Sequence, residues 1–158
     1  MTEDARFEDG VERPLRLRAE SPDDLAVISA LVQDAVAQTS EIAWARRHHR
    51  FTLLLNRFRW EDADAAERQG RPFERVQALL TFDGVLKARA NGVDPKDRDL
   101  VLALLSLAFE PGPEGAGTLR VLLAGDGEIA LDVECIDVTL TDVTRPYIAH
   151  SHSAPKHE

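Results

Sequence analysis

The feature that most constrains the fold is a run of apolar residues at every second position on both sides of the sequence Gly125-Asp126-Gly127. Every second side chain of a strand points to the same face of a sheet, and glycine accepts the backbone conformations of a tight turn. The pattern therefore predicts a β-hairpin with a three-residue loop and one apolar face. The predicted facing pairs are Leu123 with Ile129, Val121 with Leu131, Leu119 with Val133 and, on the polar face, Arg120 with Asp132.

A second glycine turn, Asp83-Gly84, lies between two more alternating segments, residues 75–81 and 85–90. A three-residue loop with a left-handed Gly84 would pair Leu80 with Leu86 and keep one face of the pair apolar. The sequence therefore predicts a second β-hairpin formed by these two segments.

Four other segments have the pattern of strands, at residues 15–19, 41–46, 50–60 and 100–109. The apolar parity of residues 50–60 shifts midway, which indicates either a bulge near residues 54–56 or cover on both faces of the strand. Residues 100–109 are apolar at nearly every position, which fits a buried helix as well as a strand. We expect a strand there, because the segment lies between the two hairpins.

The sequence Ser21-Pro22-Asp23-Asp24 is typical of a helix start, with a capping hydroxyl, a proline in the first turn and two acids near the positive end of the dipole. An apolar stripe follows it, so we predict an amphipathic helix over residues 22–36. Residues 135–144 fit a short helix by apolar spacing or a strand by β-branching, and we expect the helix. The polar residues 61–72 are expected to form a loop that can include one helical turn.

These elements predict an α+β fold: an antiparallel meander of hairpins forming a partly open barrel or strongly bent sheet, with an N-terminal amphipathic helix and a short C-terminal helix. The element count is pleckstrin-homology-like, and a simple antiparallel sheet with helices on one face is the alternative. A chain of 158 residues is long enough for one hydrophobic core, so we expect a single domain over residues 15–150. The acidic residues 1–14 and the polar residues 151–158 are predicted to be disordered tails.

The chain has a net charge of −9 and a single cysteine, Cys135. Its acidity weighs against nucleic acid and anionic membranes as partners, and one cysteine excludes an intramolecular disulfide framework. No apolar run is long enough to span a membrane, and the first residues lack the apolar stretch of a signal peptide. We therefore expect a cytoplasmic protein with no membrane partner, and Cys135 as a small core residue.

One segment opposes this acidity: residues 46–75 contain eight arginines and five acids, a net charge of +3 against −12 for the rest of the chain. Guanidinium groups bind carboxylates and phosphates through paired hydrogen bonds, and nearby aromatic rings can add stacking surface. We therefore predict a ligand-binding site between strands 41–46 and 50–60, unless these arginines pair with the chain's own acids. Its predicted residues are Arg46, Arg47, His48, His49, Arg50, Trp44 and Trp60.

The function that these residues favour is a non-enzymatic binding or interaction module that engages an acidic protein or a small anion. The first alternative is a homo-oligomeric structural protein that pairs through apolar edge strands, and the second is a small hydrolase that uses His48 or His49. Adjacent histidines of a strand point to opposite faces, and a single cysteine supplies no thiolate pair. We therefore expect no catalytic residue, no metal and no cofactor.

The run Ala124–Ile136, preceded by Phe109-Glu110-Pro111 and followed by a short histidine-containing tail, resembles a small bacterial protein family catalogued only as a domain of unknown function. The similarity covers residues 15–158. The resemblance implies one intact domain in a bacterial cytoplasmic protein, and it supplies no catalytic residues that could be transferred to this chain.

Overall fold

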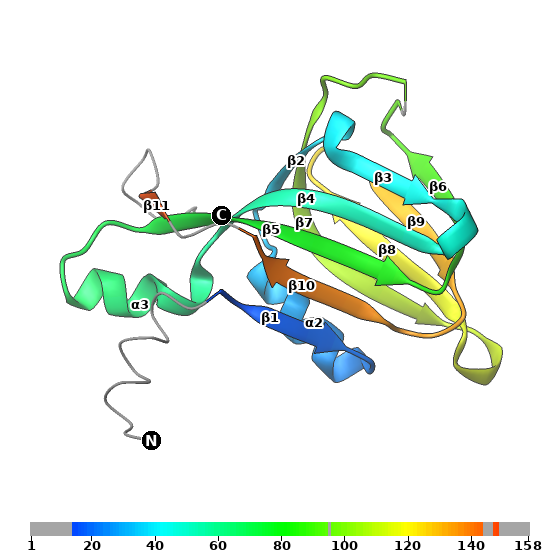
Figure 1. The fold of residues 1–158 in the computed structure, drawn as a ribbon, viewed down its shortest axis with the longest axis horizontal. Helices are drawn as coiled ribbons and strands as arrows, with labels where there is room; N and C mark the ends of the chain where they lie inside the picture. Colours follow the sequence, from blue (N-terminus) through cyan, green and yellow to red (C-terminus); the bar gives the residue numbers. More distant parts are fainter. Residues whose placement is uncertain (1–13, 95, 144–146, 149–158) are drawn as a thin grey trace.

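The computed structural model describes residues 14–94, 96–143 and 147–148. Apart from Pro14, the two predicted tails lie outside these residues. The elements, labelled as in Figure 1, are β1 (Arg16–Ala19), α2 (Pro22–Leu31), β2 (Val36–Gln38), η1 (Thr39–Glu41), β3 (Ile42–Ala45), η2 (Arg46–His48), β4 (Arg50–Phe58), α3 (Trp60–Arg68), β5 (Glu74–Asp83), β6 (Val85–Asn91), β7 (Val101–Pro111), η3 (Pro113–Gly115), β8 (Gly117–Leu123), β9 (Glu128–Val133), β10 (Val138–Asp142) and β11 (Tyr147–Ile148).

Helix α2 starts at the capping sequence and is shorter than the predicted range of 22–36. The Ser21 hydroxyl accepts a hydrogen bond from the Asp24 N–H at 3.2 Å, and Pro22 occupies the first turn. The helix ends at Leu31, and Val36 already begins β2. Neither α2 nor any other helix in the described ranges is long and apolar enough to cross a membrane.

The strands form a mostly antiparallel sheet that bends strongly but does not close, and the fold is α+β (Figure 1). The strand order is β1-β10-β5-β4-β2-β7-β8-β9-β6, with β3 beside β4 and β11 beside β5. Within the described chain, β3 pairs with β4 alone and β6 with β9 alone, so each leaves one edge free. The inward side chains of the sheet, Leu25 and Ile28 of α2, and Val32 directly after that helix form one hydrophobic core.

The predicted hairpin between residues 75–81 and 85–90 is wrong. Strand β5 pairs with β4 and β10, whereas β6 pairs with β9. Gly84 has the expected positive φ, 72°, but it directs the chain across to another part of the sheet instead of back along β5. Both strands contribute apolar side chains to the same core. This explains why their apolar positions match although the two strands do not pair.

The hairpin of β8 and β9 is present, and its register differs from the prediction by two residues. Val121 faces Ile129, and Leu119 faces Leu131. The loop still has three residues, 124–126 instead of the predicted 125–127, because the Leu123 N–H donates to the Gly127 carbonyl at 2.9 Å. A shift of two leaves the same side chains facing the core, but it changes the predicted ion pair. Arg120 contacts Glu128 at 2.8 Å, while Asp132 contacts Arg89 at 2.6 Å.

Two elements differ in type from the prediction. The short helix expected at residues 135–144 is wrong, because residues 138–142 form strand β10 between β1 and β5. The described residues after β9 therefore lack the helix that a pleckstrin-homology-like element count requires. Residues 60–68 form helix α3, a longer helix than the single turn allowed for in the predicted loop at 61–72.

A buried ion pair joins β4 to β10. The guanidinium of Arg57, which is fully buried, donates from Nε to Oδ1 of Asp142 at 3.0 Å and from Nη2 to Oδ2 at 3.1 Å. Two further hydrogen bonds, of 2.9 and 2.7 Å, reach the carboxylate of Glu61 on α3. Asp142 also accepts the Leu15 N–H at 3.1 Å, so one carboxylate fastens β4 and the start of β1 to β10.

Arg57 also explains the change of apolar parity within residues 50–60. Strand β4 pairs with β5 in one continuous register from Arg50 to Phe58, without a bulge. The inward series of Phe51, Leu53 and Leu55 continues with Arg57, whereas Phe58 is buried on the other face against Trp60 and Phe73. Of the two predicted explanations, cover on both faces is therefore the one that the strand adopts.

Candidate binding site

The predicted cationic residues form the turn between β3 and β4, here called the basic turn, Arg46–Arg50. Residues 46–48 make one 3-10 turn, and His49 follows with a φ of 52°. Its N–H donates to the Arg46 carbonyl at 3.1 Å, and its carbonyl accepts the Val85 N–H at 2.9 Å. The Nδ1 of His49 lies 3.2 Å from the Val85 carbonyl oxygen. The basic turn is therefore fastened to the first residue of β6.

The three arginines of the basic turn differ in their partners. Arg50 donates from Nε to Oδ1 of Asp83 at 2.8 Å, and this hydrogen bond raises the pKa of its guanidinium. Arg46 and Arg47 are exposed, and neither forms an ion pair or side-chain hydrogen bond within the described residues. Only these two arginines of the basic turn are thus available to an external anion.

Most other arginines of the described chain already have an acidic partner. Ion pairs occupy Arg18 with Asp137, Arg57 with Asp142, Arg59 with Glu74, Arg71 with Asp62, Arg89 with Asp132 and Arg120 with Glu128. Arg46 and Arg47 lack such a pair within the described ranges, and they are adjacent in one exposed turn.

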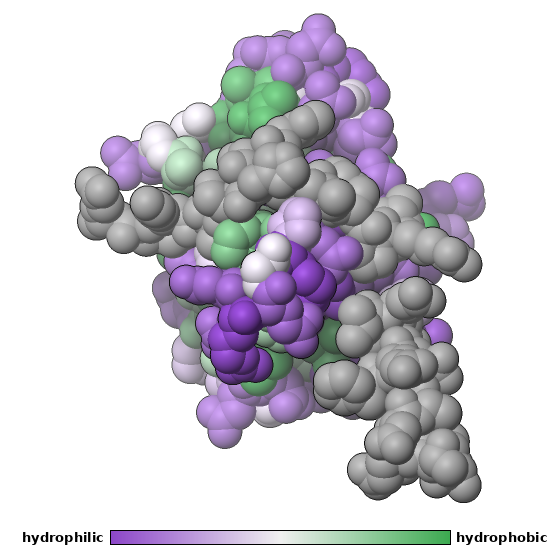
Figure 2. Space-filling view, turned by 90° about the vertical axis from the view of Figure 1, so that its left-hand side faces the viewer, coloured by the Kyte–Doolittle hydropathy of each residue, from purple (hydrophilic) through white to green (hydrophobic). Residues whose placement is uncertain are grey.

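The two predicted tryptophans do not share a site. Trp44 lies on β3, two residues before Arg46, and its ring centroid is 6.2 Å from that of Phe51. Trp60 begins α3, donates its Nε1–H to the Gln33 carbonyl at 2.9 Å and packs on Phe58. Figure 2 views the molecule from the α3 side, and the coloured part of the surface seen there is mainly hydrophilic. Trp44 thus lies near the basic turn, whereas Trp60 lies on a different element, α3.

A shallow hollow of about 380 Å³ lies beside the basic turn and is here called the outer hollow. The residues that line it come from β3, η2 and β6: Trp44, Arg46, Leu86, Lys87 and Ala88. The pairing of β6 with β9 is irregular between Val85 and Lys87, and Leu86 is 51% exposed there. The contribution of β6 was not predicted, because the apolar pattern favoured a pairing of β6 with β5.

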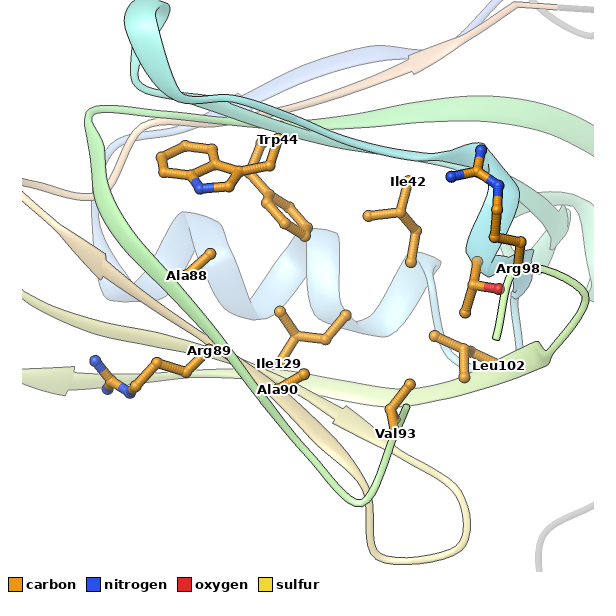
Figure 3. A pocket seen from close by; sticks show the side chains of 11 residues that line it. Ile42, Trp44, Ala88, Arg89, Ala90, Val93, Arg98, Leu102 and Ile129 are labelled. Atoms are coloured by element: carbon orange, nitrogen blue, oxygen red, sulfur yellow. The ribbon is translucent and has the colours of Figure 1, made fainter. Parts of the chain in front are cut away.

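A second, inner cavity of about 360 Å³ opens between the free edges of β3 and β6. Ile42 and Trp44 line it on one side, and Leu102 and Ile129 on the other (Figure 3). Phe51 also belongs to its apolar lining. No polar motif marks these residues in the sequence. The available signal was the small side chains of Ala88 and Ala90, which leave space on the cavity side of β6.

The remaining chemistry-bearing residues do not gather. Among the described residues, no three His, Cys, Asp or Glu side chains lie together in an arrangement that could hold a metal ion. Cys135 is exposed in the bend after β9, so its prediction as a core residue is wrong. His48 is exposed in η2, and the His49 ring contacts a backbone carbonyl rather than a carboxylate.

Comparison with known proteins gives a family but no activity. The model of the family described as "Protein of unknown function (DUF2948)" matches residues 15–157. The chain belongs to the DUF2948 family. The match spans the whole described fold of this DUF2948 protein, including both the basic turn and the inner cavity, and it agrees with the resemblance inferred from residues 109–136. No curated protein and no solved structure matches the chain.

Proposed function

We propose that this protein is a non-enzymatic binding module that engages an acidic segment of a partner protein through the basic turn. One observation supports this function above the others: Arg46 and Arg47 are exposed and have no acidic partner within the described residues, while Arg50 and most other arginines are paired. Unpaired guanidiniums bind carboxylates through charge-assisted, often bidentate hydrogen bonds.

The outer hollow supports a peptide as the ligand rather than an isolated anion. It sets the apolar surfaces of Trp44 and Leu86 beside the cations of Arg46 and Lys87. An acidic side chain next to an apolar one in the same segment can satisfy both kinds of surface at once. Tryptophan and arginine are also the side chains that most often dominate binding energy at protein interfaces.

We further propose that the module works in the cytoplasm of a bacterial cell. The support is the composition of the chain, which has one cysteine, Cys135, and leaves it exposed as a free thiol. Free thiols of this kind are stable in a reducing compartment, whereas secreted proteins usually pair their cysteines.

The proposal can be tested by selecting peptides from a random displayed library on the wild-type protein and measuring their affinity for two variants. Enriched peptides should contain Asp or Glu next to an apolar residue. Arg46→Ser with Arg47→Ser should weaken their binding by about tenfold or more, because charge-assisted hydrogen bonds are lost. Raising the salt concentration should weaken the wild-type complex as well, because the contact is exposed.

The matched control is Arg16→Ser with Arg68→Ser, which removes the same charge from two exposed positions on β1 and α3. This control should bind the selected peptides like the wild type. Equal affinities for the two double variants, or a selection without acidic enrichment, would contradict the proposed function. If millimolar inorganic phosphate displaces the selected peptide as effectively as the free peptide does, the basic turn binds small anions instead.

A further inference from the structure

The inner cavity is a wedge between two strand edges that have no strand partner in the described chain. At its narrow end, the backbone of His49 is hydrogen-bonded to Val85. At its wide end, the Thr39 N–H donates to the Leu100 carbonyl at 2.9 Å and the Ser40 N–H to the Arg98 carbonyl at 3.1 Å. The opening is thus a window in the wall of the bent sheet, tied at both ends.

The space inside the window exists because β6 presents small residues to it. Val85 is buried, and the irregular pairing between Val85 and Lys87 shifts the inward series by one residue, so that Ala88 and Ala90 line the cavity. A volume of about 360 Å³ falls at the lower end of the range of small-molecule pockets, roughly 300–1,000 Å³. Most of its lining is aromatic or aliphatic, so it suits the apolar body of a small ligand.

The charged groups at the rim indicate the ligand's polar end. The Arg98 guanidinium lies at the wide end beside Ile42, at the opposite end from the Trp44 indole (Figure 3). Arg98 has no ion pair within the described ranges, whereas Arg89 points away from the cavity and is held by Asp132 at 2.6 Å. No carboxylate is among the described residues that line the cavity. A single available cation beside an apolar cavity complements an amphipathic anion.

We propose that the inner cavity binds a small monocarboxylate with an apolar acyl or aryl body. The carboxylate contacts Arg98 at the wide end, and the body extends between Trp44 and Ile129. This site goes beyond the basic turn, because its cation lies in the loop after β6 and its walls face the core. Binding at the cavity therefore does not depend on Arg46 or Arg47.

The test uses Trp44 as the reporter, in a Trp60→Phe background in which Trp44 is the remaining tryptophan. Decanoate should shift the Trp44 emission in a saturable titration below its micellar concentration. Decylammonium, which has the same body and the opposite charge, should bind at least about tenfold more weakly. Arg98→Gln should reduce decanoate affinity by about tenfold and bring the two ligands close together.

Two substitutions distinguish the cavity from a general apolar surface. Ala90→Phe fills the cavity from β6 and should abolish saturable decanoate binding. Ala43→Phe adds the same ring on the exposed face of β3 and should leave that binding unchanged. Binding that survives Ala90→Phe, equal affinity for decanoate and decylammonium, or no response of Trp44 would each overturn the proposal. Arg46→Ser with Arg47→Ser should not alter decanoate binding, so failure here leaves the proposed function of the basic turn standing.

Discussion

Arg57 is the largest fully buried side chain of the described protein, and it is charged. Removing a charge from water is costly, and here two carboxylates, Asp142 and Glu61, offset that cost through four hydrogen bonds. The arrangement therefore tolerates the removal of both members of a pair better than the removal of one.

We expect Asp142→Asn to lower the free energy of unfolding by about 3 kcal/mol at neutral pH, because Arg57 is left buried with only Glu61 as an anion. The double variant Arg57→Met with Asp142→Leu should be more stable than Asp142→Asn. Urea denaturation measures both changes. Asp132→Asn, which breaks the half-exposed pair with Arg89, is the control and should cost less than about 1 kcal/mol. A similar loss in Asp132→Asn and Asp142→Asn would contradict the special role of burial.

This one ion pair also explains two differences between sequence and structure. Arg57 occupies an inward position of β4, so the strand shows an apparent shift of parity at residues 54–56. Asp142 occupies an inward position of β10, which hides the alternation of Val138 and Leu140 and leaves a pattern that also fits a helix. The alternation of a strand can be recognised in a sequence only where its inward residues are apolar. A buried ion pair between residues distant in sequence cannot be recognised from either residue alone.

At the level of elements, the position of β6 decides whether a site exists. Gly84 directs the chain from β5 to β6 and so places the free edge of β6 opposite β3. A Cβ at this position would have only Glu134 side-chain atoms nearby, at 3.9 Å. Glycine is therefore favoured at this position because the backbone is left-handed, and not because a side chain would lack space.

We expect Gly84→Ala to destabilise the fold by roughly 1–2 kcal/mol, the usual penalty of a left-handed non-glycine residue. Gly84→Asn should lose less, because asparagine adopts this conformation more readily. Thermal or urea unfolding of the two variants gives the comparison. An alanine variant as stable as the wild type would mean that the corner does not need a positive φ.

The sequence predicted most strand positions and the hairpin of β8 and β9, because alternation and glycine turns are local. It could not predict that β6 pairs with β9, since the apolar face of β6 fits any strand that borders the same core. The candidate site was affected in the same way. Trp44 and Arg46 were predicted from their sequence position. Leu86 and Lys87 reach the outer hollow, and Arg98 reaches the inner cavity, through contacts between segments distant in sequence.

On the scale of the whole molecule, we expect the free energy of unfolding to depend on pH in the acidic range. Burial alone raises the pKa of Glu61, but the hydrogen bonds and charge of Arg57 outweigh it and hold that pKa below its usual value. The hydrogen bond from Arg120 lowers the pKa of Glu128, and the hydrogen bond from Arg89 lowers that of Asp132. Each of these groups binds a proton more readily in the unfolded chain than in the folded one.

A carboxyl group with a depressed pKa in the folded state stabilises the fold above its unfolded pKa, which is about 4.3 for glutamate. That contribution is lost as the pH falls through the folded pKa. We therefore expect the free energy of unfolding to be nearly constant from neutral pH to about 5 and to decrease below about 4. Glu61→Gln should be less stable than the wild type at neutral pH, with a difference that shrinks on acidification. A difference independent of pH, in urea titrations at several pH values, would contradict this linkage.

The hydrogen bonds that join His49 to Val85 and residues 39–40 to residues 98–100 hold the rim of the window at a fixed width. We therefore expect the cross-section of a ligand to limit its entry: a straight-chain monocarboxylate should enter end-on, whereas one with a branched body should be excluded. This selection needs no hinge motion, so the rate of ligand entry should depend on the cross-section of the ligand far more than on its length.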